Sequence, residues 1–141
     1  MALPDTIKLE AATSRTSGFS TTTIADGATG TGDAIANQTN LDKYLTAEFY
    51  YTYGVAPTAS KTVKVYLVYA VDGTNYEDVD YNTNLAAVFS PAADTDNHRV
   101  VLLRNWPVLP FAFKLVVVNV DTAQTITLTV NAYTHNEAIV D

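Results

Sequence analysis

The chain has 141 residues, with 8 basic and 15 acidic side chains and no cysteine. A chain of this length suits one domain, and it can bury enough apolar surface for a core without covalent crosslinks. The lack of cysteine excludes disulfides and thiolate metal sites. The acidic excess argues against a nucleic-acid partner, because phosphate binding needs clustered lysine and arginine.

No membrane partner is expected either. The longest apolar run, residues 65–71, reaches about a third of the length of a membrane-spanning helix. The first residues lack a basic stretch followed by an apolar run, so the sequence predicts no signal peptide.

Residues 1–40 are poor in large apolar side chains and rich in Thr, Ala, Gly and Ser. This composition predicts an extended or loosely structured N-terminal arm with short strands around Ile7 and over residues 19–24, and with a flexible loop over residues 25–33. The arm is either a frayed terminus or a segment that orders against a partner. Residues 41–141 are predicted to form a β-sandwich domain.

Residues 40–53 fit two patterns. Leu41, Tyr44, Leu45 and Phe49 follow a helical stripe, whereas the apolar residues at every second position from Leu45 to Tyr53 suit a strand. The aromatic run at residues 49–53 favours the strand, because aromatic side chains suit pleated surfaces. A loop follows at residues 54–57.

Three further strands are predicted over residues 61–71, 85–89 and 98–104. The first has Lys64 on its outer face near its start and only apolar or tyrosine side chains near its end, so its second half is expected to be covered on both faces. Gly73 suits a tight turn that needs a positive φ. Residues 91–97 form a loop, and residues 105–110 a rigid apolar loop that carries Trp106.

The clearest signals lie near the C-terminus. Residues 113–120 form an unbroken apolar run apart from Lys114 and Asn119, which is typical of a strand at the centre of a sheet. Residues 125–133 alternate strictly between apolar and polar, which indicates one buried and one exposed face. The polar residues 121–124 between them have the length of a hairpin connection.

The sequence thus predicts eight strands, centred on Ile7, Phe19, Leu45, Val63, Leu85, Val100, Phe113 and Ile126. Short strands at regular spacing predict an all-β fold, an antiparallel β-sandwich that is jelly-roll-like with about eight strands. An immunoglobulin-like arrangement is the alternative, although its Cys…Trp…Cys pattern is absent.

No group of residues predicts chemistry, and we expect no catalytic, cofactor or metal site. Residues 72–78 carry oxygen ligands at short spacing, but without the order of an EF-hand they suit a turn better than a calcium site. His98 and His135 lie far apart, and no serine has a Gly-x-Ser-x-Gly context. Glu48 with Glu77 or Glu137 is no more than the kind of carboxylate pair that any acidic protein offers.

The aromatic side chains are better candidates. Tyr44, Tyr50, Tyr66, Tyr76 and Tyr81 fall on expected outer faces or loops, and exposed tyrosines mark interfaces and also stack on sugars. The Trp106 loop is either folded back as a core plug or buried against another subunit. The candidate partner-binding residues are Tyr44, Tyr50, Tyr66, Trp106 and Phe111.

Two stretches, residues 65–78 and 110–133, resemble a group of small virion proteins of tailed bacteriophages. The matching parts are Val65-Tyr-Leu-Val-Tyr69, Asp72-Gly-Thr-Asn-Tyr76, Pro110-Phe-Ala-Phe-Lys-Leu115, Asn119, and Leu128-Thr-Val-Asn-Ala-Tyr133 with Glu137. The pattern consists of strand and turn residues. Residues 1–40 match no family that we know.

The resemblance implies a capsid decoration (cement) protein with a β-sandwich or jelly-roll fold. Such proteins typically sit as trimers on the outside of the head and brace neighbouring subunits of the major capsid protein. A head-fibre, tail or other structural virion protein is also compatible. No motif in the pattern fixes a binding surface, so no functional residue is transferred.

Our hypothesis is therefore a structural virion protein without enzymatic activity. We expect the tyrosines and the Trp106 loop to mediate homo-oligomerisation, and residues 1–40 to reach the shell or a neighbouring subunit. The rival hypothesis is a carbohydrate-binding β-sandwich module that uses exposed tyrosines, with or without calcium at residues 72–78.

Overall fold

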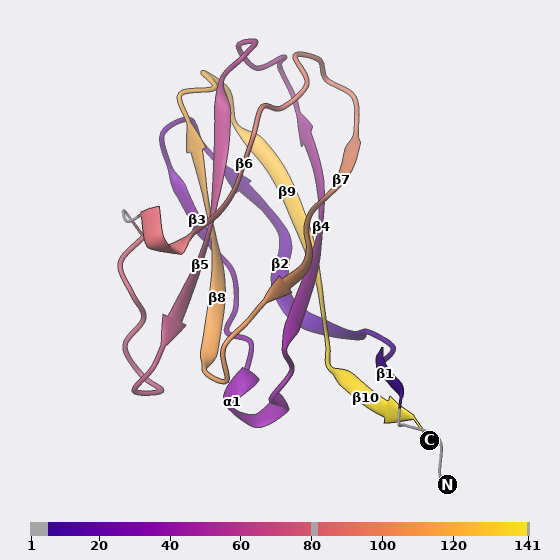
Figure 1. Cartoon of the computed structure of the whole chain (residues 1–141). Coiled ribbons are helices and arrows are strands. Elements are labelled where there is room, and N and C mark those ends of the chain that lie inside the picture. Colours follow the sequence, from indigo (N-terminus) through magenta and orange to yellow (C-terminus); the bar gives the residue numbers. More distant parts are fainter. Residues whose placement is uncertain (1–5, 80–81, 141) are drawn as a thin grey trace, which may run out of the picture.

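Two four-stranded antiparallel sheets pack face to face in the computed structural model, which describes residues 6–79 and 82–140 (Figure 1). One sheet contains, in spatial order, β2 (Thr13–Ile24), β9 (Ile126–His135), β4 (Tyr44–Tyr53) and β7 (His98–Pro107). The other contains β3 (Thr29–Thr31), β8 (Ala112–Val120), β5 (Thr62–Ala70) and β6 (Leu85–Phe89). The helical elements are α1 (Asn37–Asn40) and the 3-10 turn η1 (Asn82–Asn84).

The strand order is that of a jelly roll. Consecutive strands of the sandwich cross from one sheet to the other at every connection except the one between β5 and β6. The two orders, β2-β9-β4-β7 and β3-β8-β5-β6, make the double Greek key of eight-stranded jelly rolls. This confirms the predicted fold class and removes the immunoglobulin-like alternative.

The core lies between the sheets and is made by alternate residues of each strand. On β4 the residues Leu45, Ala47 and Phe49 are completely buried, and their neighbours face outward. On the opposing sheet Phe113 and Val65 are equally buried. The strand predicted over residues 45–53 is therefore confirmed, and period-two burial explains why it is not a helix.

The predicted hairpin over residues 121–124 is wrong, although both flanking strands are confirmed. β8 and β9 belong to different sheets, so the connection arches across the end of the sandwich. Asp121 and Ala123 have φ of 53° and 66°. Inside the arch, the hydroxyl of Thr122 donates to Oδ1 of Asn119 at 2.6 Å, and both residues are fully buried.

The expected division at residue 40 is also corrected, because the sandwich begins at residue 13. β2 pairs along β9, and β3 pairs with β8, within the segment that the composition suggested to be loose. The strand around Ile7 exists as β1 (Thr6–Leu9), but it lies outside the sandwich. Residues 29–31 take its place in the count of eight.

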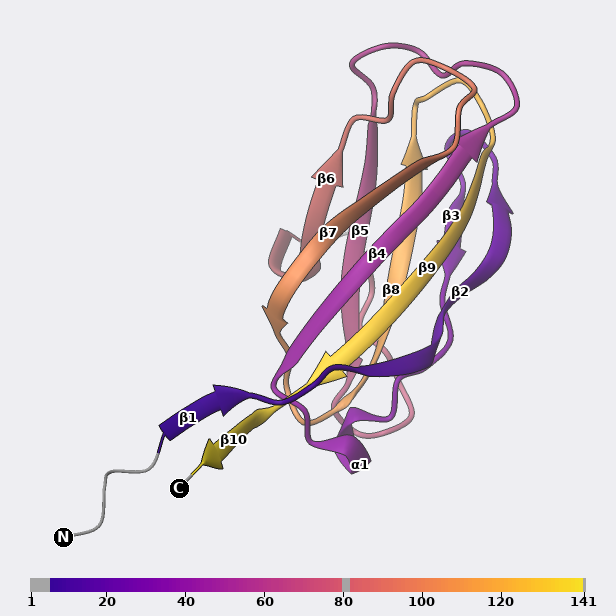
Figure 2. The ribbon, with the colours of Figure 1, turned by 90° about the vertical axis from the view of Figure 1, so that its right-hand side faces the viewer.

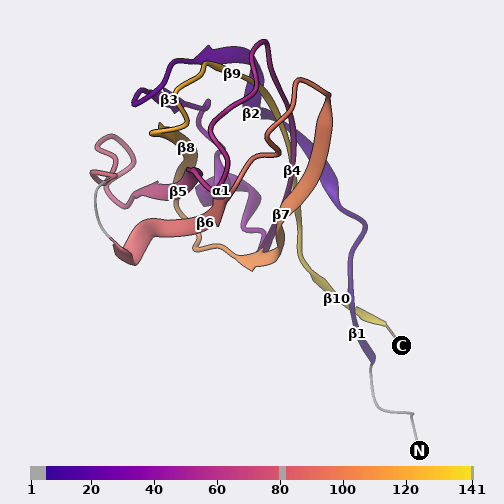
Figure 3. The same ribbon diagram turned by 90° about the horizontal axis from the view of Figure 1, so that it is seen from above.

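β1 pairs with β10 (Glu137–Val140) in a separate two-stranded ribbon. This terminal ribbon projects from one end of the sandwich, as Figure 2 shows beside the β2-β9-β4-β7 sheet. From above, the ribbon points away from both sheets (Figure 3). The two ends of the described chain thus lie together on an extension outside the core.

The outer face of β5 is covered at its second half, as predicted. Tyr66 and Val68 are buried with Val116, and residues of the long β5–β6 connection, among them Tyr76 and Val79, pack over them. Tyr66 is only 8% exposed. The expectation that Tyr66 lies on an exposed face is therefore wrong, since the connection covers that face.

Candidate functional site

Four exposed apolar side chains lie at the end of the sandwich that carries the ribbon. Three connections reach this end: residues 32–43 with α1, the first residues of the connection that begins at residue 71, and residues 108–111 (Figure 1). Leu41, Val71, Trp106 and Leu109 are 57%, 65%, 37% and 52% exposed. We call these four residues the apolar end, and such exposed groups of large apolar side chains mark interaction sites.

A buried asparagine joins two of the contributing connections. The side-chain amide of Asn37 donates to the carbonyl oxygens of Leu109, at 2.7 Å, and of Asp42, at 3.0 Å. Its Oδ1 accepts the backbone N–H of Asp42. Asn37 is fully buried, so these bonds fix the main chain that presents Leu41 and Leu109.

Leu41 adopts an unusual conformation for its residue type. It ends α1 with φ 54° and ψ 31°, the left-handed region in which glycine or asparagine is normal. Its backbone N–H donates to the carbonyl oxygen of Asn37 at 2.8 Å, while its side chain points into solvent. This conformation costs about 1 kcal/mol or more in a residue with a Cβ. Burial of the side chain does not offset that cost, because Leu41 is 57% exposed.

Trp106 is neither a core plug nor part of a loop. β7 continues to Pro107, and a register irregularity between Leu45 and Ala47 accommodates Asn105, whose φ is 48°. The backbone N–H of Asn105 donates to the hydroxyl of Thr46. This bulge leaves Trp106 on the strand and partly exposed, beside a small hollow that it shares with Tyr69 and Leu85.

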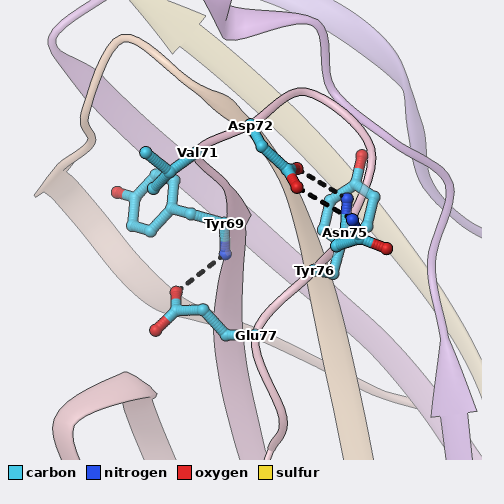
Figure 4. A pocket seen from close by; sticks show the side chains of 6 residues that line it. All are labelled: Tyr69, Val71, Asp72, Asn75, Tyr76 and Glu77. Atoms are coloured by element: carbon cyan, nitrogen blue, oxygen red, sulfur yellow. Dashed lines mark hydrogen bonds between the residues drawn. The ribbon is translucent and has the colours of Figure 1, made fainter.

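Tyr69 connects the parts of the apolar end. Its hydroxyl accepts the backbone N–H of Leu109 at 3.0 Å, and its ring meets Phe111 and Phe113 edge-on. On its other side lies an open hollow of about 380 Å³, lined by Tyr69, Val71, Asp72, Asn75, Tyr76 and Glu77 (Figure 4). The hollow has apolar walls and two carboxylates.

Both carboxylates accept hydrogen bonds from backbone N–H groups. Hydrogen bonds from the backbone N–H of Asn75, from its side-chain amide and from the backbone N–H of Thr74 lower the pKa of Asp72 to about 2. Glu77 accepts the backbone N–H of Tyr69 at 2.9 Å (Figure 4). Within residues 6–79 and 82–140, no group of three His, Cys, Asp or Glu side chains is placed to hold a metal ion. Residues 72–78 are therefore a turn, with Gly73 at φ 81°.

Tyr44 lies at the root of the ribbon. Its hydroxyl donates to Oε1 of Glu137 at 2.6 Å, and its ring stacks on His135 with centroids 5.4 Å apart. The hydrogen bond from Tyr44 and the charge of Lys43 lower the pKa of Glu137, and the same hydrogen bond raises the pKa of Tyr44. These contacts attach the first residue of β10 to β4.

The other predicted residues are dispersed. Tyr50 lies on the outer face of the β2-β9-β4-β7 sheet, 36% exposed, with the guanidinium of Arg99 5.2 Å from its ring centroid. Phe111 is half-buried against Tyr69. Tyr81 lies outside the described residues. The structure therefore groups Trp106 and Phe111 around Tyr69, but it leaves Tyr50 on a separate face.

The titratable candidates do not assemble either. Nε2 of His98 lies 2.7 Å from Oδ1 of Asp94, whose carboxylate accepts the hydrogen bond, whereas His135 is buried at the other end of the sandwich. Glu48 lies on the outer face of β4, and Glu77 lies in the connection over the other sheet. Neither arrangement forms an acid–base pair.

Sequence reasoning missed Leu41 and Val71 as surface residues, together with the ribbon. Leu41 fitted an apolar stripe, and Val71 ended an apolar run, so both patterns assigned them to a core. The pairing of residues 6–9 with residues 137–140 joins opposite ends of the chain. No local pattern reports such a pairing.

Comparison with known proteins gives no identification. No protein-family model matches the chain, and no curated protein matches it either. Among the described residues, the helices are too short and too polar to cross a membrane.

Proposed function

We propose that this protein is a structural virion protein without enzymatic activity, which decorates the outside of a tailed-phage head and braces neighbouring subunits of the major capsid protein. The observation that carries the proposal is the combination, at one end of a jelly roll, of a projecting terminal ribbon and an apolar end. Jelly rolls are common in viral capsid proteins and also in lectins, so the fold alone does not decide.

The surface features support bracing better than catalysis. The apolar side chains at the ribbon end offer contact area, each Å² of which contributes about 25 cal/mol before the costs of association. In an oligomer several copies of the protein reach the shell together, so weak single contacts add up to firm attachment. The net charge of −7 keeps such a protein soluble and away from packaged DNA.

The test is co-sedimentation of the purified protein with heads that lack it. These heads are prepared from a phage in which the gene for this protein is deleted. We expect saturable binding that is lost on removal of residues 1–9. Removal of the first 15 residues is a poorer test, because Arg15 bonds to Asp42 at 2.7 Å and to Thr134 at 2.6 Å and so stabilises the sandwich. Heads that bind no wild-type protein would refute the proposal.

A second candidate rests on another face. Tyr50 and Tyr133, 36% and 37% exposed, lie on the outer face of the β2-β9-β4-β7 sheet, with Glu48 paired to Asn131 between them. Two flat rings around polar side chains suit stacking on an oligosaccharide. Titration with neutral glycans, followed through the melting temperature, tests this alternative, and an unchanged melting temperature would count against it.

A further inference from the structure

The terminal ribbon needs a surface to pack on. β1 and β10 pair through four residues each, from Thr6 with Val140 to Leu9 with Glu137, and the backbone N–H of Glu10 continues the pairing to Asn136. Beyond this mutual pairing, neither strand makes an extensive contact with another described element. A two-stranded ribbon by itself is marginally stable in water, because it has no core.

The apolar end exposes apolar side chains that a contact with another segment would bury. Leu41, Val71 and Leu109 are each more than half exposed, and Leu41 is held in a left-handed conformation that gains it no core contact. Beside Val71 lies the open hollow between Tyr69 and Tyr76 (Figure 4). A surface with apolar residues, a hollow and a strained apolar side chain fits an apolar segment laid across it.

The ribbon is such a segment by composition. Thr6-Ile-Lys-Leu9 and Glu137-Ala-Ile-Val140 contain five apolar residues and one charge of each sign. Glu137 is already paired with Tyr44 and Lys43 of its own chain. By sequence the ribbon carries one basic residue, Lys8, and the hollow has Asp72 and Glu77 at its edge.

We propose that the β1–β10 ribbon of one copy of this protein packs on the apolar end of a second copy. A copy cannot serve its own ribbon, because the ribbon leaves the sandwich beside β2 and β9 and points away from it (Figures 2 and 3). The contact joins two different surfaces, so it is heterologous and closes into a ring when the rotation between copies permits. The inference concerns the protein alone and does not rest on the proposed function.

The first experiment measures mass by light scattering on a sizing column. Wild-type protein is expected to run as a closed oligomer, and Leu41→Glu with Leu109→Glu as a 15.2 kDa monomer. Val71→Glu, from a different connection, is expected to do the same. Val55→Glu is the matched control, because Val55 is 60% exposed on the connection between β4 and β5, at the opposite end of the sandwich. It should leave the oligomer intact.

The second experiment is a complementation. A chain without residues 1–9 lacks β1 and so cannot form the two-stranded ribbon, although it retains β10 and the apolar end. The Leu41→Glu, Leu109→Glu chain keeps the ribbon but lacks the apolar end. Neither is expected to associate with itself, but an equimolar mixture should give a dimer with one copy of each, slightly lighter than twice 15.2 kDa because one chain lacks nine residues. A mixture that stays monomeric, a monomeric wild type, or a Val55→Glu chain that dissociates as well would each overturn the proposal.

Heads take no part in either experiment. If the oligomer forms as expected but does not bind heads, the proposed function fails and the self-association stands. A cooperative urea transition for each exposed-site variant confirms that a loss of mass reflects a lost contact and not unfolding.

Discussion

Replacing Asn119 with alanine tests how the sheets are joined at the end opposite the ribbon. The side-chain amide of Asn119 donates to the carbonyl oxygens of Ile24, at 2.9 Å, and Gln124, at 2.7 Å, and its Oδ1 accepts the Thr122 hydroxyl at 2.6 Å. Asn119 is fully buried on β8, so no water replaces these bonds at its surface. It links the last residue of β2 to the arch between β8 and β9.

The magnitude follows from these three bonds. Each contributes about 1 kcal/mol net, and a buried partner left without a bond costs about 1 to 3 kcal/mol. The Thr122 hydroxyl also reaches the carbonyl oxygen of Gln124 at 3.0 Å, which limits the loss at that atom. We therefore expect Asn119→Ala to lower the free energy of unfolding by about 3 kcal/mol, and the melting temperature by on the order of 10 °C.

The assay is urea unfolding followed by circular dichroism and by the fluorescence of Trp106, the single tryptophan. Asn131→Ala on β9 is the control, because Asn131 is exposed and makes only a 3.4 Å contact with Glu48. It should change stability by less than about 0.5 kcal/mol. If Asn119→Ala were as mild as the control, the buried network would not hold the arch and our account of the sheet connection would be wrong.

Further predictions concern the core, the acid limb and metals. Leu128→Ala and Val116→Ala should each lower the free energy of unfolding, Leu128→Ala by about 2 to 5 kcal/mol and the smaller valine by less, because both are at most 3% exposed; unchanged urea midpoints would contradict this. The pKa of Asp72 is lowered from 3.8 to about 2, so its contribution to the free energy of unfolding is present above pH 4 and is lost as the pH falls through 2. Asp72→Asn should therefore weaken the dependence of the melting temperature on pH between 4 and 2. The same pH dependence in the variant and the wild type would show that ionisation of Asp72 does not stabilise the fold. Calcium or EDTA should leave the melting temperature unaltered, because the Asp72 oxygens already accept three hydrogen bonds, and a rise with calcium would show a metal site.

Much of the fold was predictable because period-two burial is a local signal. Ile126, Leu128, Val130 and Ala132 are buried as their alternation indicated, and the aromatic run of β4 resolved a helix–strand ambiguity correctly. The pairing of these strands was not predictable from the same signal. A short polar connection suits a hairpin and an arch between sheets alike, and only the buried Asn119 and Thr122 distinguish them.

The candidate site shows the same limit. Tyr66 reads as an outward residue on β5, and it is outward, but the β5–β6 connection covers it. Residues 29–31 read as a loop because their composition is Thr and Gly, yet they supply an edge strand through backbone bonds to β8. Both errors come from tertiary contacts that override local composition.

The central claim is that this protein braces a shell, and the thermal release of DNA from phage heads tests it most directly. Heads without the protein are heated alone, with wild-type protein, or with protein lacking residues 1–9, and a dye reports released DNA. A protein that binds only the assembled shell must stabilise it, so the account predicts a higher release temperature with wild type and little change with the truncated chain. Release at the same temperature in all three samples would contradict it.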